Sequence, residues 1–241
     1  VLFDTIKEQD IIPQRVNTGC FSLSYPISFS DNKERKYSCS LQYMMSQKAL
    51  LSNDQEAFNK IMKSSSMSEI VEFGRHLKHF DQKKWDQNSE QIVYQGNYYK
   101  FSQNDQLKAF LLSFPLNTIF VNADPQNNYW GIKLSVNDQK ALNPNKWQGF
   151  NKLGFQLTRV RDDLIKQTPE LPAPIEYPVT TTEGLYSLES LCKAWKEVKR
   201  FNFVYFWQIG EIDYEYLNES CFCQWFPSDF HDDAGTVYNC C

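Results

Sequence analysis

Lys48 is the first residue whose position suggests chemistry. Leu41, Met45 and Lys48 are spaced as i, i+4 and i+7, so a helix would place all three on one face. A lysine that ends an apolar stripe commonly lies at the edge of a core face, with its ammonium group reaching water. The alternative is that its charge lies over a pocket. The spacing alone leaves both interpretations open.

Arg75 is a second candidate cation, and it follows Gly74. A glycine lets a ligand come close to the backbone, and a guanidinium group can bind a phosphate or carboxylate through two hydrogen bonds. The alternative is a surface arginine that pairs with Glu69 or Glu72. From the residues alone, the surface ion pair is favoured.

The run from Tyr37 to Ala49 carries a resemblance to a known family. Its pattern, Tyr-x-x-x-x-Gln-Tyr-Met-Met-x-x-Lys-Ala, is similar to the signature of the NADAR family, also called YbiA-like. Further motifs follow in the family's order, and together they cover about residues 18–166. These motifs are Phe73-Gly74-Arg75, Trp85 with Lys100-Phe101-Ser102-Gln103-Asn104, Trp130-Gly131-Ile132, and Trp147-x-Gly149-x-Asn151-x-Leu153-Gly154.

The resemblance implies the chemistry of an N-glycosidase. Family members cleave the bond between the anomeric carbon of a ribose and a nitrogen, in ADP-ribosylated nucleobases or phosphoribosyl-amino pyrimidines. Such cleavage passes through an oxocarbenium-like state, and a carboxylate stabilises that charge or activates the attacking water. On this resemblance, ligand contacts are expected from Gln42, Lys48, Arg75, Trp85, Trp130 and Gly131.

This chain departs from the family at the three acidic positions of the motifs. Leu41 stands where the family usually has a catalytic glutamate, and Asn122 and Asn127 stand at the other two acidic positions. An asparagine keeps the shape and the hydrogen bonds of an acid but carries no negative charge. Without these carboxylates, Lys48 and Arg75 are expected to face one cleft together with Asn127.

Two functions remain open for this domain. In the first, residues 18–166 are a catalytically degenerate domain that binds an ADP-ribose-like or phosphoribosyl ligand, or that supports a neighbour by packing. Leu41 should then be buried beside Trp130. In the second, the protein is an active N-glycosidase that uses another carboxylate, with Asp124 the nearest, or a second copy of the domain. ADP-ribosylated nucleic acid is a possible partner.

The composition argues against several other classes of protein. The chain has 241 residues, 41% of them hydrophobic, and its net charge of -4 gives no electrostatic case for nonspecific nucleic-acid binding. No apolar run approaches the roughly 18 residues of a membrane span. The seven cysteines are an odd number without zinc-ribbon spacing, so neither a disulfide framework nor a metal site is expected. Reduced cysteines indicate a cytoplasmic or nuclear protein, and no cofactor is expected.

The elements that must position these residues are mostly helices. The predicted fold class is α+β and helix-dominated, with a few short strands. Four prolines and three consecutive threonines mark residues 168–182 as a linker between a divergent domain at 1–167 and a segment at 183–241. Helices are expected at about 41–51, 105–112 and 185–200, with another ending near 166, and strands at 1–3, 21–29, 118–121 and 203–207.

The segment after the linker repeats the beginning of the first domain. Cys221, Phe222, Pro227, Phe230, Asp232, Tyr238 and Cys240 each lie 201 residues after an identical residue between Cys20 and Cys39. A repeat at a fixed offset is typical of duplicated structural units. We therefore interpret 183–241 as the lead-in and truncated start of a second NADAR-like domain, expected to pack against the first.

Overall fold

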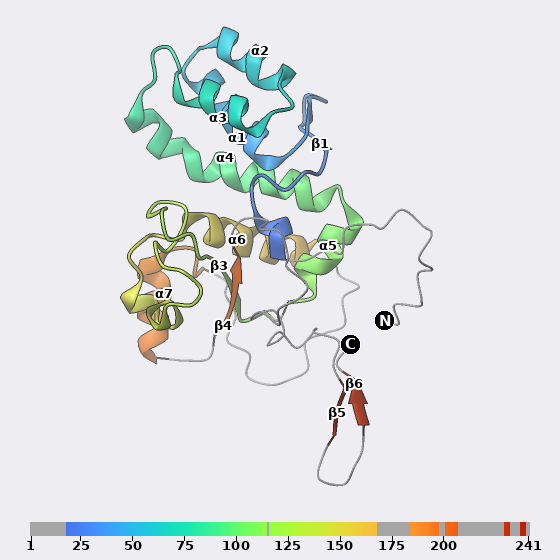
Figure 1. Cartoon of the computed structure of the whole chain (residues 1–241), viewed down its shortest axis with the longest axis vertical. Coiled ribbons are helices and arrows are strands. Elements are labelled where there is room, and N and C mark those ends of the chain that lie inside the picture. Colours follow the sequence, from blue (N-terminus) through green and yellow to red (C-terminus); the bar gives the residue numbers. More distant parts are fainter. Residues whose placement is uncertain are drawn as a thin grey trace. The chain divides into compact units, whose positions relative to one another are not determined.

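The computed structural model describes residues 18–114, 116–167, 184–197, 201–206, 229–231 and 237–239 (Figure 1). These residues fall into two compact units, one within 1–208 and the other within 209–241. The first unit holds all the described helices and strands β1 to β4, and the second holds β5 and β6.

Helices dominate the first unit, which confirms the predicted helix-dominated α+β fold. The described helices are η1 (Thr18–Phe21), α1 (Ser40–Leu51), α2 (Gln55–Lys63), α3 (Met67–Arg75), α4 (Gln82–Ser102), α5 (Asp105–Leu112), η2 (Gln139–Leu142), η3 (Pro144–Lys146), α6 (Lys152–Lys166) and α7 (Leu188–Glu197).

Local side chains fix where the first helices begin. At the start of α1, the thiol of Cys39 accepts a hydrogen bond from the backbone N–H of Gln42. Asp54 caps α2 and Asp81 caps α4 by accepting from backbone N–H groups in the first turn. Such caps satisfy donors that have no partner inside the helix.

The described strands form short pairs. Strands β1 (Phe29–Ser30) and β2 (Lys36–Tyr37) are antiparallel, as are β5 (Asp229–His231) and β6 (Val237–Asn239). Strand β3 (Thr118–Asn122) is parallel to β4 (Asn202–Phe206), so the predicted strands near 118–121 and 203–207 are confirmed in their described parts.

The predicted strand over 21–29 is wrong for most of its length. The segment begins in η1, and the N–H of Tyr25 donates to the carbonyl of Ser22 in a turn. Pro26 has no N–H to contribute to a strand ladder. Only Phe29 enters a strand. The expected strand at 1–3 and the linker at 168–182 lie outside the described residues.

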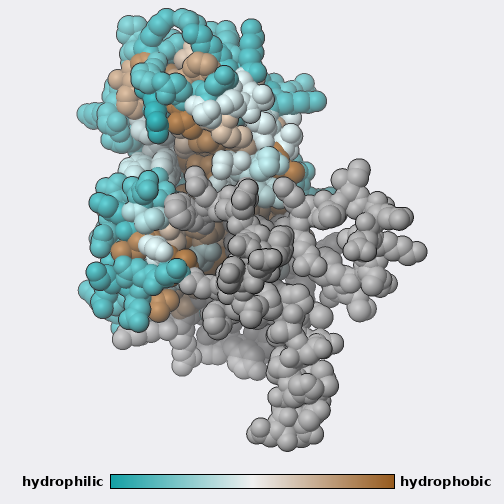
Figure 2. Space-filling model, in the orientation of Figure 1, coloured by the Kyte–Doolittle hydropathy of each residue, from teal (hydrophilic) through white to brown (hydrophobic). Residues whose placement is uncertain are grey.

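Helix α4 lies at the centre of the first unit. Helix α1 packs on one side of it together with α2 and α3, and α6 packs on the other side and covers β3 (Figure 1). Residues from η1, α4, β3 and α6 share one core, in which the ring centroids of Phe21 and Phe120 are 4.8 Å apart. On the face drawn in Figure 2, polar residues cover the outer surface over α2 and α3.

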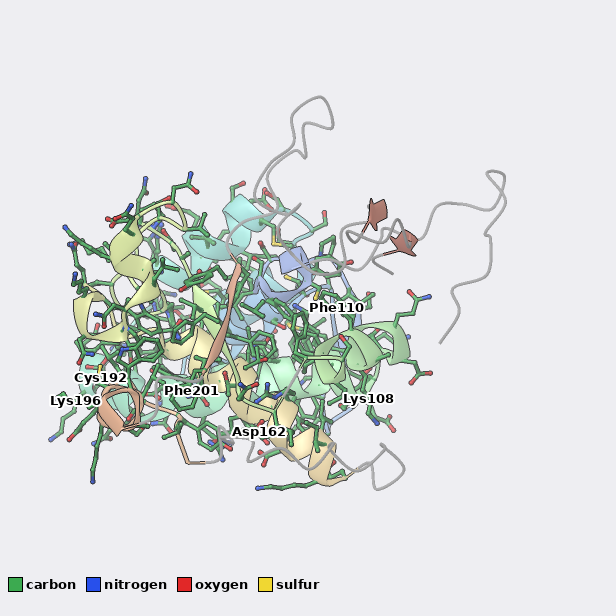
Figure 3. The ribbon with its side chains drawn as sticks, turned by 90° about the horizontal axis from the view of Figure 1, so that it is seen from below. Lys108, Phe110, Asp162, Cys192, Lys196 and Phe201 are labelled. Carbon is green, nitrogen blue, oxygen red and sulfur yellow. The ribbon has the colours of Figure 1, made fainter. Side chains whose placement is uncertain are left out.

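Residues 184–206 belong to the first unit, although they follow the predicted linker. Helix α7 packs on η3, and β4 pairs with β3. The hydroxyl of Tyr186 donates to Asp162, and the hydroxyl of Tyr205 donates to the carbonyl of Ala141, each at 3.0 Å. The ring of Trp195 on α7 lies 6.5 Å from that of Phe201, which precedes β4, and Figure 3 labels Cys192 and Lys196 on the same helix. The structure thus places this segment with the first domain.

Strands β5 and β6 repeat the register of β1 and β2. Phe230 faces Tyr238 and His231 faces Val237, and these pairs lie 201 residues after Phe29–Tyr37 and Ser30–Lys36. The backbone pairing therefore follows the offset found in the sequence. That a second NADAR-like domain begins in this region stays a prediction.

Within the part of the chain that the structure describes, no helix is both long enough and apolar enough to cross a membrane.

Gly154 sets the distance between α6 and β3, because a Cβ at this position would lie 2.1 Å from the carbonyl oxygen of Phe120. Gly154→Ala should therefore lower the free energy of unfolding by roughly 2–4 kcal/mol, since the backbone of β3 cannot move aside locally. Urea denaturation measures the change. Lys83→Ala, at an exposed position of α4, is the control and should change it by less than about 0.5 kcal/mol. Equal stability of Gly154→Ala and the control would contradict the close contact.

Candidate functional site

A cavity of about 300 Å³ opens between the start of α1, the end of β3 and the start of α6. Its walls mix apolar side chains with amides and a carboxylate. They are formed by Ser22, Leu23 and Ser24 after η1, Leu41, Met44 and Met45 from α1, Asn122 from β3, Asp124, Asn127 and Trp130 from the next loop, Leu153 from α6, and Phe206 from β4.

The three positions at which the family resemblance expects acids meet in this cavity. Leu41, Asn122 and Asn127 all line it, and so does Trp130. Leu41 is partly buried and packs against the same core as Trp130, so the two residues share one side of the domain as expected. The burial of Leu41 is partial because its side chain borders the cavity.

Asn127 has a structural task that its sequence position did not reveal. Its Oδ1 accepts hydrogen bonds from the backbone N–H groups of Tyr129 (3.1 Å) and Trp130 (2.9 Å). An asparagine that accepts from the backbone two and three residues ahead forms a tight turn. This turn fixes Trp130 at the cavity wall. An aspartate at position 127 could accept the same two hydrogen bonds. Asn127 therefore forms the same turn but brings no negative charge to the cavity.

Asp124 is the one described residue lining the cavity that has a carboxyl group. Its Oδ1 accepts from the N–H of Gln126 at 2.8 Å, and no hydrogen bond to its Oδ2 is recorded among the described residues. Asp124 is partly exposed, whereas Asn122 is 6% exposed. Asp124 was the alternative catalytic acid expected from the sequence. In the structure it lines the same cavity as Leu41, Asn122 and Asn127.

Gly131 lets the loop after β3 fold back on the strand. A Cβ at this position would lie 2.8 Å from the carbonyl oxygen of Asn122 and 3.0 Å from that of Asn127. The glycine is buried and does not line the cavity. Its observed role is close backbone packing, while its expected ligand contact stays a prediction.

Lys48 lies on the same face of α1 as Leu41 and Met45, toward the end of the helix, where residues from other parts of the chain surround it. Its Nζ donates to the carbonyl of Gly74 at 2.8 Å and lies 4.4 Å and 5.6 Å from the ring centroids of Phe80 and Trp85. Burial lowers the pKa of Lys48, and the charge of Arg75 lowers it further. We refer to Lys48, Arg75, Phe80 and Trp85 as the cation group.

The cation group is not neutralised by the acids that were considered as surface partners. Glu72 pairs with His76, and Glu69 accepts from the hydroxyl of Ser64. No ion pair of Lys48 or Arg75 is recorded among the described residues. Two neighbouring cations without a paired carboxylate can accept an anion.

The expected single cleft for Lys48, Arg75 and Asn127 is not present in this structure. Asn127 lines the cavity, whereas the cation group does not. Lys48 instead donates to the carbonyl of Gly74. Met45 lines the cavity, and its Sδ would be 2.5 Å from a Cβ at Gly74. Met45 thus touches both the cavity and Gly74, whose carbonyl accepts from Lys48.

Gln42 connects α1 to α2 and does not line the cavity. Its Nε2 donates to the carbonyls of Ile61 and Ser64, and its Oε1 accepts from the N–H and the hydroxyl of Ser38. The side chain is buried and fully used by these bonds. Its expected ligand contact stays a prediction, and its observed role is to hold the helices together.

Lys100 is a buried cation behind the cavity wall that sequence reasoning singled out only as part of a motif. Its side chain is completely buried, and Nζ donates to the carbonyl of Ser22 at 2.8 Å. The rings of Tyr25 and Phe101 lie 5.4 Å and 5.2 Å away. Burial lowers the pKa of Lys100 to about 8. Because Ser22 lines the cavity, Lys100 supports one of its walls.

The family model of the NADAR domain matches residues 11–165. The N-glycosidase R617 of Acanthamoeba polyphaga mimivirus is 39% identical over 147 residues, which are 59% of this chain and 86% of the viral protein. Protein irg-1 of Caenorhabditis elegans is 33% identical over 159 residues, covering 60% of this chain and 74% of the relative. The NMR structure of the E. coli protein YbiA matches with a TM-score of 0.51 at 23% identity, covering 66% of this chain and 88% of YbiA, so it is similar in fold.

Lys100 should make stability depend on pH in a defined direction. Because its pKa in the folded protein is about 8 and its ordinary value is 10.5, the unfolded chain binds the proton more tightly between these pH values. The wild type should therefore gain stability relative to Lys100→Met as the pH rises from 7 to 10, by up to roughly 3 kcal/mol. Urea denaturation of both proteins at several pH values measures the difference.

The wild type and Lys100→Met share every titratable group except Lys100, so the contributions of the shared groups cancel in the stability difference between the two proteins. Gln106→Met, at an exposed position of α5, changes no titratable group and is the control, so its stability relative to the wild type should stay constant over the same range. A constant difference for Lys100→Met as well would show that Lys100 is charged to the same extent in the folded and unfolded chains.

Proposed function

Because the chain belongs to the NADAR domain family, we propose that its first unit binds a ligand with a ribose and a phosphate, of the ADP-ribose or phosphoribosyl type. The similarity to a protein named N-glycosidase R617 supports a ligand that contains an N-glycosidic bond. The observation that carries the proposal is that Met45, on the cavity wall, lies against Gly74, whose carbonyl accepts from Lys48 of the cation group.

Helix α1 links the two regions along one face. Leu41 and Met45 line the cavity, and Lys48 lies three residues beyond Met45. At 1.5 Å per residue, Leu41 and Lys48 are separated by roughly 10 Å along the helix. A ligand with a sugar and base in the cavity could thus extend a phosphate toward Lys48 and Arg75, displacing the bond from Lys48 to the carbonyl of Gly74.

The cavity is better suited to binding than to hydrolysis. Leu41, Asn122 and Asn127 supply one apolar surface and two amides at the positions where the family has acids. Amides can hold ribose hydroxyls by hydrogen bonds, but they neither accept a proton from water nor stabilise an oxocarbenium-like charge as a carboxylate does. We therefore propose a catalytically degenerate domain that retains ligand binding.

A second candidate function, an active N-glycosidase, is favoured by Asp124. This residue brings a carboxylate to the cavity, and one of its oxygens has no recorded protein partner among the described residues. A single carboxylate can activate a water molecule for attack on the anomeric carbon. The two candidates differ in whether Asp124 is needed for turnover.

We also infer a cytoplasmic or nuclear location. The described cysteines, Cys20, Cys39 and Cys192, are free thiols. Reducing compartments keep thiols in this state. Imaging of the tagged protein in cells tests the inference, and a secreted protein would contradict it.

Removal of either cation should weaken ligand binding. Arg75→Ala and Lys48→Met should each raise the Kd for ADP-ribose by about tenfold, because a charge-assisted hydrogen bond to phosphate contributes on the order of 1.5–3 kcal/mol. Isothermal titration calorimetry with the full chain measures the Kd. Lys108→Met repeats the lysine substitution on α5 and should leave the Kd unchanged. Unaltered binding by both variants would remove the cation group from the site.

Activity separates the two candidate functions. The wild type should release no base above background from an ADP-ribosylated guanine nucleotide, because the three motif positions are neutral. The triple variant Leu41→Glu, Asn122→Glu and Asn127→Asp should gain turnover by orders of magnitude, since a carboxylate beside the developing charge lowers the barrier by several kcal/mol. Chromatography of the released base measures the rate.

The contrary outcome is turnover by the wild type that Asp124→Asn abolishes and that Asp86→Asn, on the exposed face of α4, leaves unchanged. That result would establish the N-glycosidase candidate. A thermal melt of each variant shows whether the buried substitution at Asn122 has unfolded the domain.

A further inference from the structure

Phe206 lines the cavity from outside the residues that match the family. The family model ends at residue 165, whereas Phe206 lies on β4, beyond the predicted linker. The side chain is 4% exposed, and its ring centroid is 5.6 Å from that of Phe21 in an edge-to-face arrangement. Part of the cavity wall is therefore supplied by a segment that the family motifs do not include.

The backbone of β4 holds Phe206 in a fixed register. Five residue pairs join β3 to β4 in parallel, from Thr118–Asn202 to Asn122–Phe206. The carbonyl of Phe206 also accepts a hydrogen bond of 2.9 Å from the N–H of Ala123. Asn122, the register partner of Phe206, lines the same cavity. The strand pairing thus sets the position of the aromatic ring relative to the site.

Side chains of β4 alternate between two cores. Val204 and Phe206 pack with the core that borders the cavity, whereas Phe203 and Tyr205 pack with the core around Trp147. Successive residues of a strand point to opposite faces of the sheet, so this division follows from the backbone. A substitution at Phe203 therefore disturbs the same strand without touching the cavity.

The segment is anchored independently of any ligand. The hydroxyl of Tyr186 donates to Asp162 on α6, and the ring of Trp195 on α7 packs 5.4 Å from that of Phe203. The ring of Trp147 also lies 5.8 Å from that of Phe203. These contacts within the protein hold β4 in place, so Phe206 lines the cavity whether or not a ligand is bound.

We propose that Phe206 is a specificity-determining residue that contacts the ring-bearing part of the ligand. The ring of Phe206 and the indole of Trp130 are the two aromatic groups among the described residues that line the cavity. Aromatic walls favour a planar base by stacking and by apolar contact. The end of β4 is then part of the binding site. This proposal rests on the proposed function, because it assigns the base of that ligand to one wall.

Two matched variants of the full chain test the proposal. Phe206→Ala should weaken ADP-ribose binding by about tenfold, as expected for the loss of an aromatic contact with a base. Phe203→Ala removes the same number of atoms from the opposite face of β4, and its Kd should change by less than about threefold. Calorimetric titration below the melting temperature of both variants measures the Kd. Equal loss of binding in the two variants would overturn the proposal, because the effect would then come from the strand.

A thiol-labelling experiment tests the wall without a ligand. Leu41→Cys places a thiol in the cavity, and its reaction with N-ethylmaleimide is followed on that peptide by mass spectrometry. Adding Phe206→Ala should raise the labelling rate several-fold, whereas adding Phe203→Ala should not. Equal rates would show that Phe206 does not close the cavity, and the proposal would fall.

The two experiments separate this proposal from the proposed function. If the wild type does not bind ADP-ribose, the proposed function fails, and with it the contact of Phe206 with the base. A faster labelling rate in Phe206→Ala would still establish Phe206 as a wall. If the wild type binds ADP-ribose and Phe206→Ala binds equally well, the proposed function stands and the role of Phe206 is wrong.

Discussion

The side chain of Asn151 joins β3 to the start of α6, and the cavity depends on this attachment. Its Nδ2 donates to the carbonyl of Phe120, and its Oδ1 accepts from the N–H of Asn122, both at 2.9 Å. The amide thereby pairs with the strand as a neighbouring backbone would. Asn151 is fully buried and adopts a left-handed conformation with φ of 51°, which asparagine tolerates better than most residues. Asn122 and Leu153, on either side of this attachment, both line the cavity.

The sequence motifs located the cavity but did not reveal how its parts are held. The resemblance placed Leu41, Asn122 and Asn127 together, and the structure agrees. It did not reveal that Asn127 forms a turn or that Lys48 donates to the carbonyl of Gly74, because these bonds depend on backbone groups that become neighbours only after folding. The helix expected at 41–51 is confirmed as α1, but its most buried face carries Gln42, Ser46 and Ala49, while the stripe of Leu41, Met45 and Lys48 is only half-buried.

The contribution of β4 could not be predicted from the order of the chain. The proline-rich segment at 168–182 indicates a domain boundary in the sequence. Functional residues that follow such a segment are usually assigned to another domain. Strand pairing overrides that boundary here, because β3 gains a hydrogen-bonded neighbour and a buried aromatic face from β4. The hairpin β5–β6 follows the repeat in the sequence more closely, since its register depends on local pairing alone.

The parallel pairing of β3 with β4 has a consequence for how the protein is made. Thr118 pairs with Asn202, so the sheet closes a long stretch of chain, and such contacts form late because their loop must first lose entropy. As the chain leaves the ribosome, β3 and the whole family-matched region emerge before β4 does. Until then β3 has an open edge, and unpaired edges favour pairing with other chains. The time needed to translate the residues between β3 and β4 thus adds to the period in which the nascent protein exposes this edge to other chains.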